Sequence, residues 1–162
     1  MKKRHNKRKG FSLIELLIVV TIILIIAAIA IPNLMRSKIQ ANETAAVGAL
    51  EALTESALLY SNSYGGFPHT LSDMGPAAGG TAATSAAADL IDSVLAGGVK
   101  SGYRFAYVPV ARDPAGNVLS YTVTATPVAP GSSGQRSFFT DQSGTIRSTS
   151  SGTADSTSAP LG

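Results

Sequence analysis

An apolar stretch near the start of the chain constrains the fold more than any other feature. Residues 11–31 include 18 apolar residues out of 21, and only Ser12, Glu15 and Thr21 interrupt them. A helix of that length spans about 31 Å, close to the thickness of the hydrocarbon core of a bilayer. The stretch therefore predicts a helix that crosses a membrane.

Positive charge is concentrated directly before this stretch. Six of the thirteen Lys and Arg residues lie within the first nine residues, where there is no acidic residue. From residue 10 onward, seven basic and ten acidic residues give a net charge of −3. Because cations mark the cytoplasmic flank of a membrane helix, we expect the N-terminus in the cytoplasm and the rest of the chain outside it. One short basic block does not describe a nucleic-acid-binding surface, so we predict no nucleic-acid partner.

A secretory signal peptide is the alternative explanation for the apolar stretch. Such a peptide has a shorter apolar region, ends in small residues at a cleavage site and is removed whole. Ala27, Ala28 and Ala30 resemble that site, but the stretch is too long and a helical pattern continues beyond it. We therefore expect an anchor that is retained in membrane lipid.

Glu15 needs an explanation of its own, because a carboxylate within a membrane span is costly. Insertion scales put that cost at roughly 2.5–3.5 kcal/mol at the centre of a helix. Glu15 either lies close enough to the cytoplasmic face for its side chain to reach water, or it has a cationic partner.

The sequence KGFSLIEL at residues 9–16, with a basic leader before it and an apolar helix after it, resembles the class III signal of type IV pilins and pseudopilins. The resemblance implies that a prepilin peptidase and methyltransferase cuts after Gly10, removes the leader 1–10 and methylates the new amine of Phe11. It also implies that Glu15 meets the Phe11 amine of a neighbouring subunit. At about 4 Å such a pair is worth roughly 4 kcal/mol at an effective dielectric constant of 20.

Pro32 matches the helix-disrupting proline of that family. Proline lacks a backbone donor and its ring clashes with the preceding turn, so we expect a kink around residues 28–33 or the end of the helix. Helical spacing resumes afterwards, which favours one long helix with a membrane half at 11–31 and an amphipathic half at 32–64. The residues that recur at this spacing are Ala46, Leu50, Leu53, Ala57, Tyr60 and Tyr64.

Residues 65–147 predict loops and a small antiparallel sheet. Glycines and a proline at 65–68 end the helix, residues 75–88 form a loop, and residues 89–96 predict a short helix. Residues 103–108 and 119–126 alternate with period two around a turn at 113–117, with Leu119 on the apolar face of its strand. A second hairpin is expected from 137–140 and 145–147.

The predicted sheet needs a cover for its apolar face, and the second half of the long helix offers the apolar surface to supply it. The fold class is therefore α+β: a long N-terminal helix packed against a small antiparallel sheet, as the resemblance to pilins also implies. The chain has no cysteine, so no disulfide holds the last strand. Residues 148–162 are almost all small or polar and predict a flexible tail.

The sequence offers no candidate for catalysis, for a cofactor or for a metal. Its two histidines are His5, within the leader, and His69, in a proline-flanked loop where we interpret it as a surface residue. Residues 141–144 faintly resemble a calcium loop, but they lack nearby acids and are better explained as a hairpin turn. We therefore expect no enzyme.

These features favour a structural subunit of a type IV pilus or a related filament. Its expected partners are the processing peptidase, copies of itself or other pilins, and an inner-membrane assembly platform. The expected location is the bacterial inner membrane, then an extracellular filament or a periplasmic pseudopilus. A pseudopilin of a type II secretion system is the alternative, and a membrane-tethered enzyme or binding module is a third possibility that does not need Glu15.

Overall fold

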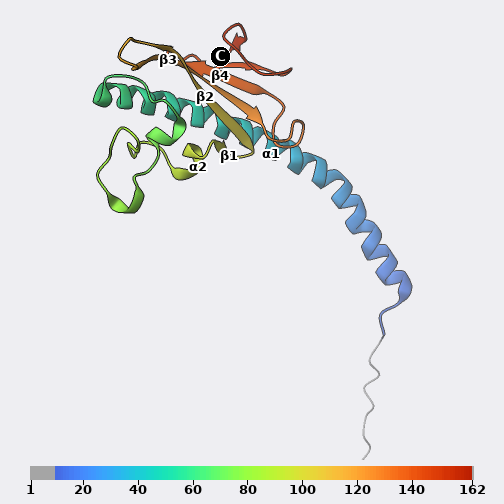
Figure 1. The fold of residues 1–162 in the computed structure, drawn as a ribbon. Helices are drawn as coiled ribbons and strands as arrows, with labels where there is room; N and C mark the ends of the chain where they lie inside the picture. Colours follow the sequence, from blue (N-terminus) through green and yellow to red (C-terminus); the bar gives the residue numbers. More distant parts are fainter. Residues whose placement is uncertain (1–9, 162) are drawn as a thin grey trace, which may run out of the picture. The chain divides into compact units, whose positions relative to one another are not determined.

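The computed structural model describes residues 10–161, so the leader up to residue 9 lies outside the described residues. The chain divides into two compact units, one up to Ser37 and one from Lys38 onward. Helix α1 (Leu13–Tyr64) runs through both units, as expected for one long helix, and the sheet follows it in the chain (Figure 1).

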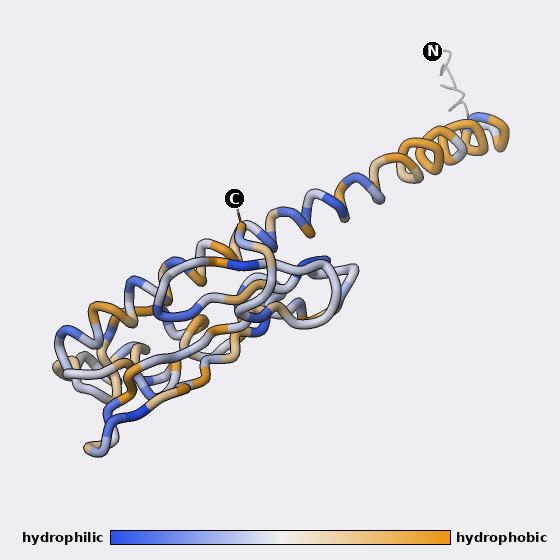
Figure 2. The backbone as a smooth tube through the Cα atoms, turned by 90° about the horizontal axis from the view of Figure 1, so that it is seen from above, coloured by the Kyte–Doolittle hydropathy of each residue, from blue (hydrophilic) through white to orange (hydrophobic). Residues whose placement is uncertain are grey.

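The two parts of α1 differ in hydropathy. Apolar residues occupy almost every position of its first turns, whereas polar and apolar residues alternate later (Figure 2). In the second unit the apolar positions form one buried stripe, which the helical spacing predicts. Of the six residues predicted for that stripe, Tyr64 at the end of the helix is 37% exposed and the others are buried: Ala46, Leu50, Leu53, Ala57 and Tyr60.

Six strands form one sheet in which each strand pairs with the next along the chain, and every pair is antiparallel. The hairpin predicted around residues 113–117 is confirmed as β2 and β3. The second hairpin is confirmed as β4 and β5, although its second strand covers residues 147–149 and not the predicted 145–147. The strands are β1 (Val99–Lys100), β2 (Tyr103–Arg112), β3 (Val118–Pro127), β4 (Ser137–Asp141), β5 (Arg147–Thr149) and β6 (Ala159–Pro160).

Leu119 does not lie on the apolar face of β3, so that expectation was wrong. Its side chain is 55% exposed, while its neighbour Val118 is buried. The pairing of β2 with β3 is irregular here, because Ala111 lies opposite Ser120 and the next residue, Arg112, lies opposite Val118. Leu119 has no partner in the ladder, and a bulge of this kind turns a side chain to the other face.

The core lies between the second part of α1 and one face of the sheet. The sheet residues Tyr103, Tyr121, Val123 and Phe138 belong to the same buried cluster as the buried apolar residues of α1. Two short helices close the end of that core. They are a 3-10 helix at Leu71–Met74 and helix α2 (Ser93–Ala96), and a further 3-10 turn covers Ala78–Gly80.

Helix α2 is shorter than the helix predicted over residues 89–96. Asp89 has a positive φ of 55°, which is not helical, and the side chain of Asp92 accepts hydrogen bonds from the backbone N–H groups of Val94 and Leu95. Asp92 is therefore the N-cap, and the helix begins after it.

The segment after Arg147, expected to be a loose tail, is attached to the sheet in the structure. It contributes most of β5 and all of β6. The hydroxyl of Ser137 accepts from the backbone N–H of Ala154 at 2.8 Å and donates to the carbonyl of Gly152 at 2.8 Å. These hydrogen bonds involve the backbone, so the small and polar composition of the segment does not reveal them.

Candidate assembly site at the start of helix α1

Gly10 and Phe11 lie just before the first turn of α1. Both are exposed, and the Phe11 side chain is 78% exposed. Among the described residues, none beyond the immediate chain neighbours of Gly10 has an atom within 4 Å of the position that a Cβ would occupy there. The peptide bond predicted to be cut therefore lies outside regular structure, at the boundary between the leader and the helix.

Glu15 lies in the first turn of α1 and has a partner within its own chain. The backbone N–H of Ser12 donates to Glu15 Oε2 at 2.9 Å, while the backbone N–H of Leu16 donates to the carbonyl of Ser12 at 3.2 Å. Ser12 thus occupies the N-cap position and Glu15 the third helical position, and this contact is one half of a capping box. Sequence analysis did not identify it, although the spacing Ser-x-x-Glu could have done so.

The capping contact holds the carboxylate of Glu15 at the backbone nitrogen of Ser12, the residue that follows Phe11 in the chain. A negative charge in this position is favoured by the helix dipole. Among the described residues, Glu15 Oε1 accepts no hydrogen bond, so one oxygen of the carboxylate is still available. Cleavage after Gly10 would put an amine beside this carboxylate and on the same exposed end of the helix.

Helix α1 continues through Pro32, so the alternative in which the helix ends there is wrong. The hydroxyl of Ser37 donates to the carbonyl of Asn33 at 3.1 Å, and Thr21 makes the same type of bond to Leu17 at 2.8 Å. Hydroxyl groups that bond back to the preceding turn tend to bend helices. The kink at Pro32 stays a prediction.

The described part of the chain has one helix, α1, that is long and apolar enough to cross a membrane by length and composition. The large apolar side chains from Phe11, just before this helix, to Ile31 are all exposed in the single chain. Exposed apolar surface of this extent is incompatible with water and needs either lipid or other helices around it.

A second polar site attaches α1 to the loop between β3 and β4. Glu43 is 6% exposed, and its Oε1 accepts hydrogen bonds from the backbone N–H groups of Gln135 at 2.8 Å and Arg136 at 3.1 Å. Its Oε2 lies 2.8 Å from Arg136 Nε. Burial alone raises the pKa of Glu43, but these hydrogen bonds and the guanidinium outweigh it, so the pKa lies below its ordinary value. Sequence analysis did not single out Glu43, because its position along the helix does not distinguish a buried glutamate from an exposed one.

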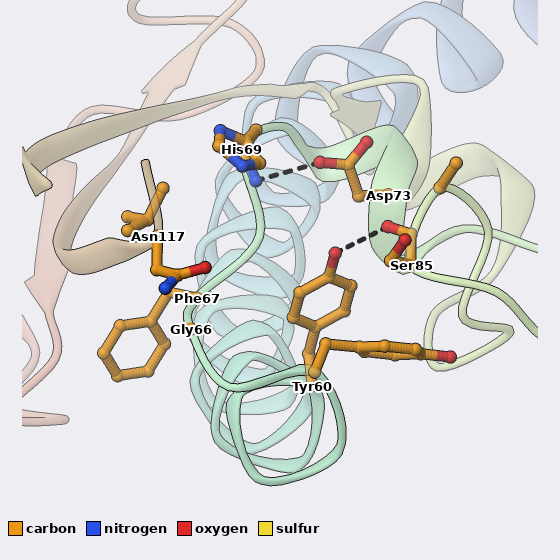
Figure 3. Close-up of a pocket in the computed structure, with 10 residues that line it drawn as sticks. Tyr60, Gly66, Phe67, His69, Asp73, Ser85 and Asn117 are labelled. Carbon is orange, nitrogen blue, oxygen red and sulfur yellow. Dashed lines mark hydrogen bonds between the residues drawn. The ribbon is translucent and has the colours of Figure 1, made fainter. Parts of the chain in front are cut away.

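The cavity around His69 does not contain a catalytic arrangement (Figure 3). It has a volume of about 430 Å³ and lies between the end of α1 and the loop that follows. The carboxylate of Asp73 accepts from the backbone N–H of His69 at 2.9 Å, not from the imidazole, and the hydroxyl of Tyr60 donates to the carbonyl of Ser85. These polar groups are thus used to hold the loop.

No group of three His, Cys, Asp or Glu side chains within residues 10–161 is arranged to hold a metal ion. At residues 141–144, the Asp141 carboxylate accepts from the backbone N–H of Ser143 at 2.8 Å, and the N–H of Gly144 donates to the carbonyl of Asp141. This is the geometry of a turn.

Comparison with known proteins gives matches in the N-terminal part of the chain. Residues 5–31 match the model of the prokaryotic N-terminal methylation motif. The type IV wide pilus major component PilA4 of Thermus thermophilus is 46% identical over 59 residues, which cover 35% of this chain and 45% of that protein. Type II secretion system core protein G of Escherichia coli is 36% identical over 34% of this chain and 38% of its own length. The same protein of Aeromonas hydrophila is 34% identical over 43% of this chain and 48% of its own length.

The chain spans less than half the length of each of these relatives. No solved structure matches it. The match to the methylation motif includes Gly10, Phe11 and Glu15, three of the four residues that the resemblance to pilins singled out, and it ends one residue before the fourth, Pro32. The chain therefore matches the N-terminal methylation motif and is similar, over its N-terminal part, to a type IV pilus major component and to type II secretion system core protein G.

Proposed function

We propose that this protein is a structural subunit of a type IV pilus or a pilus-like filament. The carrying observation is that residues 5–31, which match the methylation motif, include the first turns of α1, where the large apolar side chains are exposed. A lipid bilayer can surround this helix in a single subunit, and the helices of other copies can surround it in a filament. The same surface thus accounts for storage in the membrane and for assembly.

Processing is the step that links these two states in the proposal. A membrane peptidase and methyltransferase removes residues 1–10 and methylates Phe11, and the Glu15 carboxylate then pairs with the amine of a neighbouring copy. Support comes from the exposed junction at Gly10 and from the available oxygen of Glu15. Pro32, inside α1, is proposed to loosen the helix as it packs.

The proposed location is the bacterial inner membrane, with the N-terminus in the cytoplasm, followed by a filament outside it. The basic block before residue 10 supports this orientation. An inner-membrane assembly platform is the remaining proposed partner. The proposal includes no catalytic activity, since the cavity at His69 uses its polar groups structurally.

A pseudopilin of a type II secretion system is the second candidate. The specific observation for it is that core protein G from several bacteria matches the same N-terminal part of this chain. In that case the filament would be periplasmic. Loss of secreted hydrolases on deletion of the gene would favour this candidate, whereas loss of surface filaments with normal secretion would favour the pilus.

The proposed function is tested by shearing cells that express the full chain and probing the sheared fraction for it. We expect the parent in that fraction and a Gly10→Val variant only in the membrane as an uncut precursor. Exclusion of the parent from filaments in both sheared and periplasmic fractions would reject a filament subunit of either kind.

A further inference from the structure

Lys38 and Glu55 are two exposed, opposite charges on α1, and both belong to the second unit. Among the described residues, neither side chain takes part in an ion pair or in a side-chain hydrogen bond. They are seventeen residues apart, which is about 26 Å along a helix, so they cannot reach each other within one chain. Each charge can therefore pair only with another molecule.

The surroundings of these two charges on α1 favour such a pairing. No residue of opposite charge lies three or four positions from either one. Glu51 lies one turn before Glu55, and like charges four residues apart weaken a helix. A cation from another molecule would therefore stabilise this part of α1, and a second copy of the chain brings one in its own Lys38.

The surface of α1 between the two charges consists of small side chains. We call the exposed residues Ala41, Ala45, Gly48 and Ala52 the small-residue face. Their spacing places them on one side of the helix, and small side chains let the axis of a second helix approach closely. Among the described residues outside the backbone of α1, none has an atom within 4 Å of the position of a Cβ on Gly48, so the face is open there.

The two charges lie on opposite flanks of the small-residue face. At about 100° per residue, Lys38 lies about 50° to one side of the middle of the face and Glu55 about 50° to the other side. When two parallel helices meet through the same face, opposite flanks of the two helices come together, as the e and g positions of a parallel coiled coil do. Lys38 of one copy and Glu55 of another therefore lie on the same side of such a contact.

We propose that the α1 helices of two neighbouring copies pack in parallel through the small-residue face with a shift of about 26 Å, so that Lys38 of one copy pairs with Glu55 of the other. Copies of one chain enter the membrane in the same orientation, which makes their helices parallel. The shift also brings Leu59, which is 56% exposed, level with Ala41 and Ala45 of the neighbouring copy. This inference rests on the proposed filament function and adds the shift between copies.

A shifted contact of this kind belongs to a filament. Each copy at an end keeps one free Lys38 or one free Glu55, so the contact repeats along an open assembly. The proposed pair of Glu15 with the Phe11 amine needs a shift of only about 6 Å, so the two pairs join one copy to two different neighbours. Copies anchored in one bilayer are not shifted, because the apolar stretch holds them at the same depth. The contact should therefore be absent from the membrane pool.

The chain has no cysteine, which makes a direct test possible. Full-length Lys38→Cys and Glu55→Cys copies with different tags are coexpressed with an excess of the parent, and filaments and membranes are treated separately with a short bis-maleimide. We expect a cross-linked species with both tags in the filament fraction. The membrane fraction should contain at least about tenfold less of it, because copies at one depth hold these residues apart.

Arg104→Cys is the matched control for Lys38→Cys. Arg104 is an exposed cation of β2, and its neighbours Tyr103 and Phe105 belong to the core, so Arg104 lies on the face of the sheet that is turned away from α1. In filaments, Arg104→Cys should cross-link to Glu55→Cys at least about tenfold less than Lys38→Cys does.

Charge reversal gives a second, independent measurement. Lys38→Glu and Glu55→Lys should each lower the yield of filament at least about tenfold, and the two together should recover it to within about twofold, because specificity depends on the pairing of charges. Arg104→Glu should leave the yield unchanged. Recovery in the double variant would also show that both substitutions allow folding and membrane insertion.

The outcomes separate the contact from the filament. Filaments in which residues 38 and 55 do not cross-link, or parental yields for both single reversals, would overturn this inference and leave the proposed function intact. Equal cross-linking in membranes and filaments would also overturn it, because the contact would then need no shift. Absence of the parent from every filament fraction would reject the proposed function and this inference together.

Discussion

The carboxylate of Glu15 has two roles in this account. Its Oε2 accepts a hydrogen bond from the backbone N–H of Ser12 and so caps the start of α1, whereas its Oε1 has no partner among the described residues. In the proposed filament the same carboxylate also balances the charge of an amine. Glutamine can fill the first role, because it also forms capping boxes, but it cannot fill the second.

Glu15→Ala and Glu15→Gln therefore separate capping from charge pairing. Both variants should enter the membrane at least as well as the parent and be cut after Gly10, because a charge has been removed from lipid. Neither should assemble, because the Phe11 amine would be buried unpaired. The measurement is the amount of each tagged variant in sheared filaments. Parental yield for Glu15→Gln would mean that Glu15 acts only as a cap.

Glu43 is the second residue whose charge carries a structural role. Glu43→Gln should lower the free energy of unfolding at pH 7 by roughly 1.5–3 kcal/mol, as for other hydrogen bonds to charged groups. Urea titration of the full chain in detergent measures this change in the free energy of unfolding. Glu51→Gln is the control, and this exposed residue should change stability by less than about 0.5 kcal/mol.

The contribution of Glu43 should also depend on pH, with a definite sign. Its pKa in the folded chain lies below the ordinary value of 4.5, so its stabilisation is present above that pH and is lost as the pH falls through the folded pKa. Its ionisable neighbours are Arg136 and Tyr103, and burial raises the pKa of Tyr103 to about 12. The difference between parent and Glu43→Gln should therefore shrink between pH 5 and pH 2. A difference that grows in acid would contradict this account.

At the scale of elements, the regular parts of the fold follow from periodicity. Helix α1 and the β2–β3 hairpin were predicted because each presents a continuous apolar stripe with its own period. The bulge at Leu119 was not predicted, because it depends on how β2 and β3 pair over residues 109–121. The attachment of residues 150–160 to Ser137 was missed for a similar reason: a single hydroxyl makes it, between segments far apart in the sequence.

The contact between β2 and the loop before β4 can be tested by substituting one glycine in that loop, Gly134. Gly134 is buried, and a Cβ there would overlap the hydroxyl of Tyr103, which donates to the carbonyl of Arg136. Gly134→Ala should cost roughly 1–3 kcal/mol, as for other overpacked sites. Gly48→Ala, in α1 with open space around it, is the matched control and should be neutral or stabilising. Thermal unfolding of both variants decides the matter, and equal melting temperatures would show that Tyr103 is free to move.

At the scale of the molecule, the two units differ in the side chains that they expose. The first exposes large apolar side chains from Phe11 to Ile31, whereas the second buries its apolar side chains in a core of its own. The candidate site could be predicted from the sequence because its motif is short and contiguous: Gly10, Phe11 and Glu15 lie within six residues. The hydrogen bonds of Glu43 could not, because Gln135 and Arg136, which donate them, lie more than ninety residues further along the chain.

The most direct test of the account is the intact mass of the chain in sheared filaments, with sequencing of its N-terminus. The account predicts a filament subunit that begins at Phe11, lacks residues 1–10 and carries one added methyl group. A filament subunit that begins at Met1, or one that begins beyond Ala30 after removal of the whole apolar stretch, would contradict it.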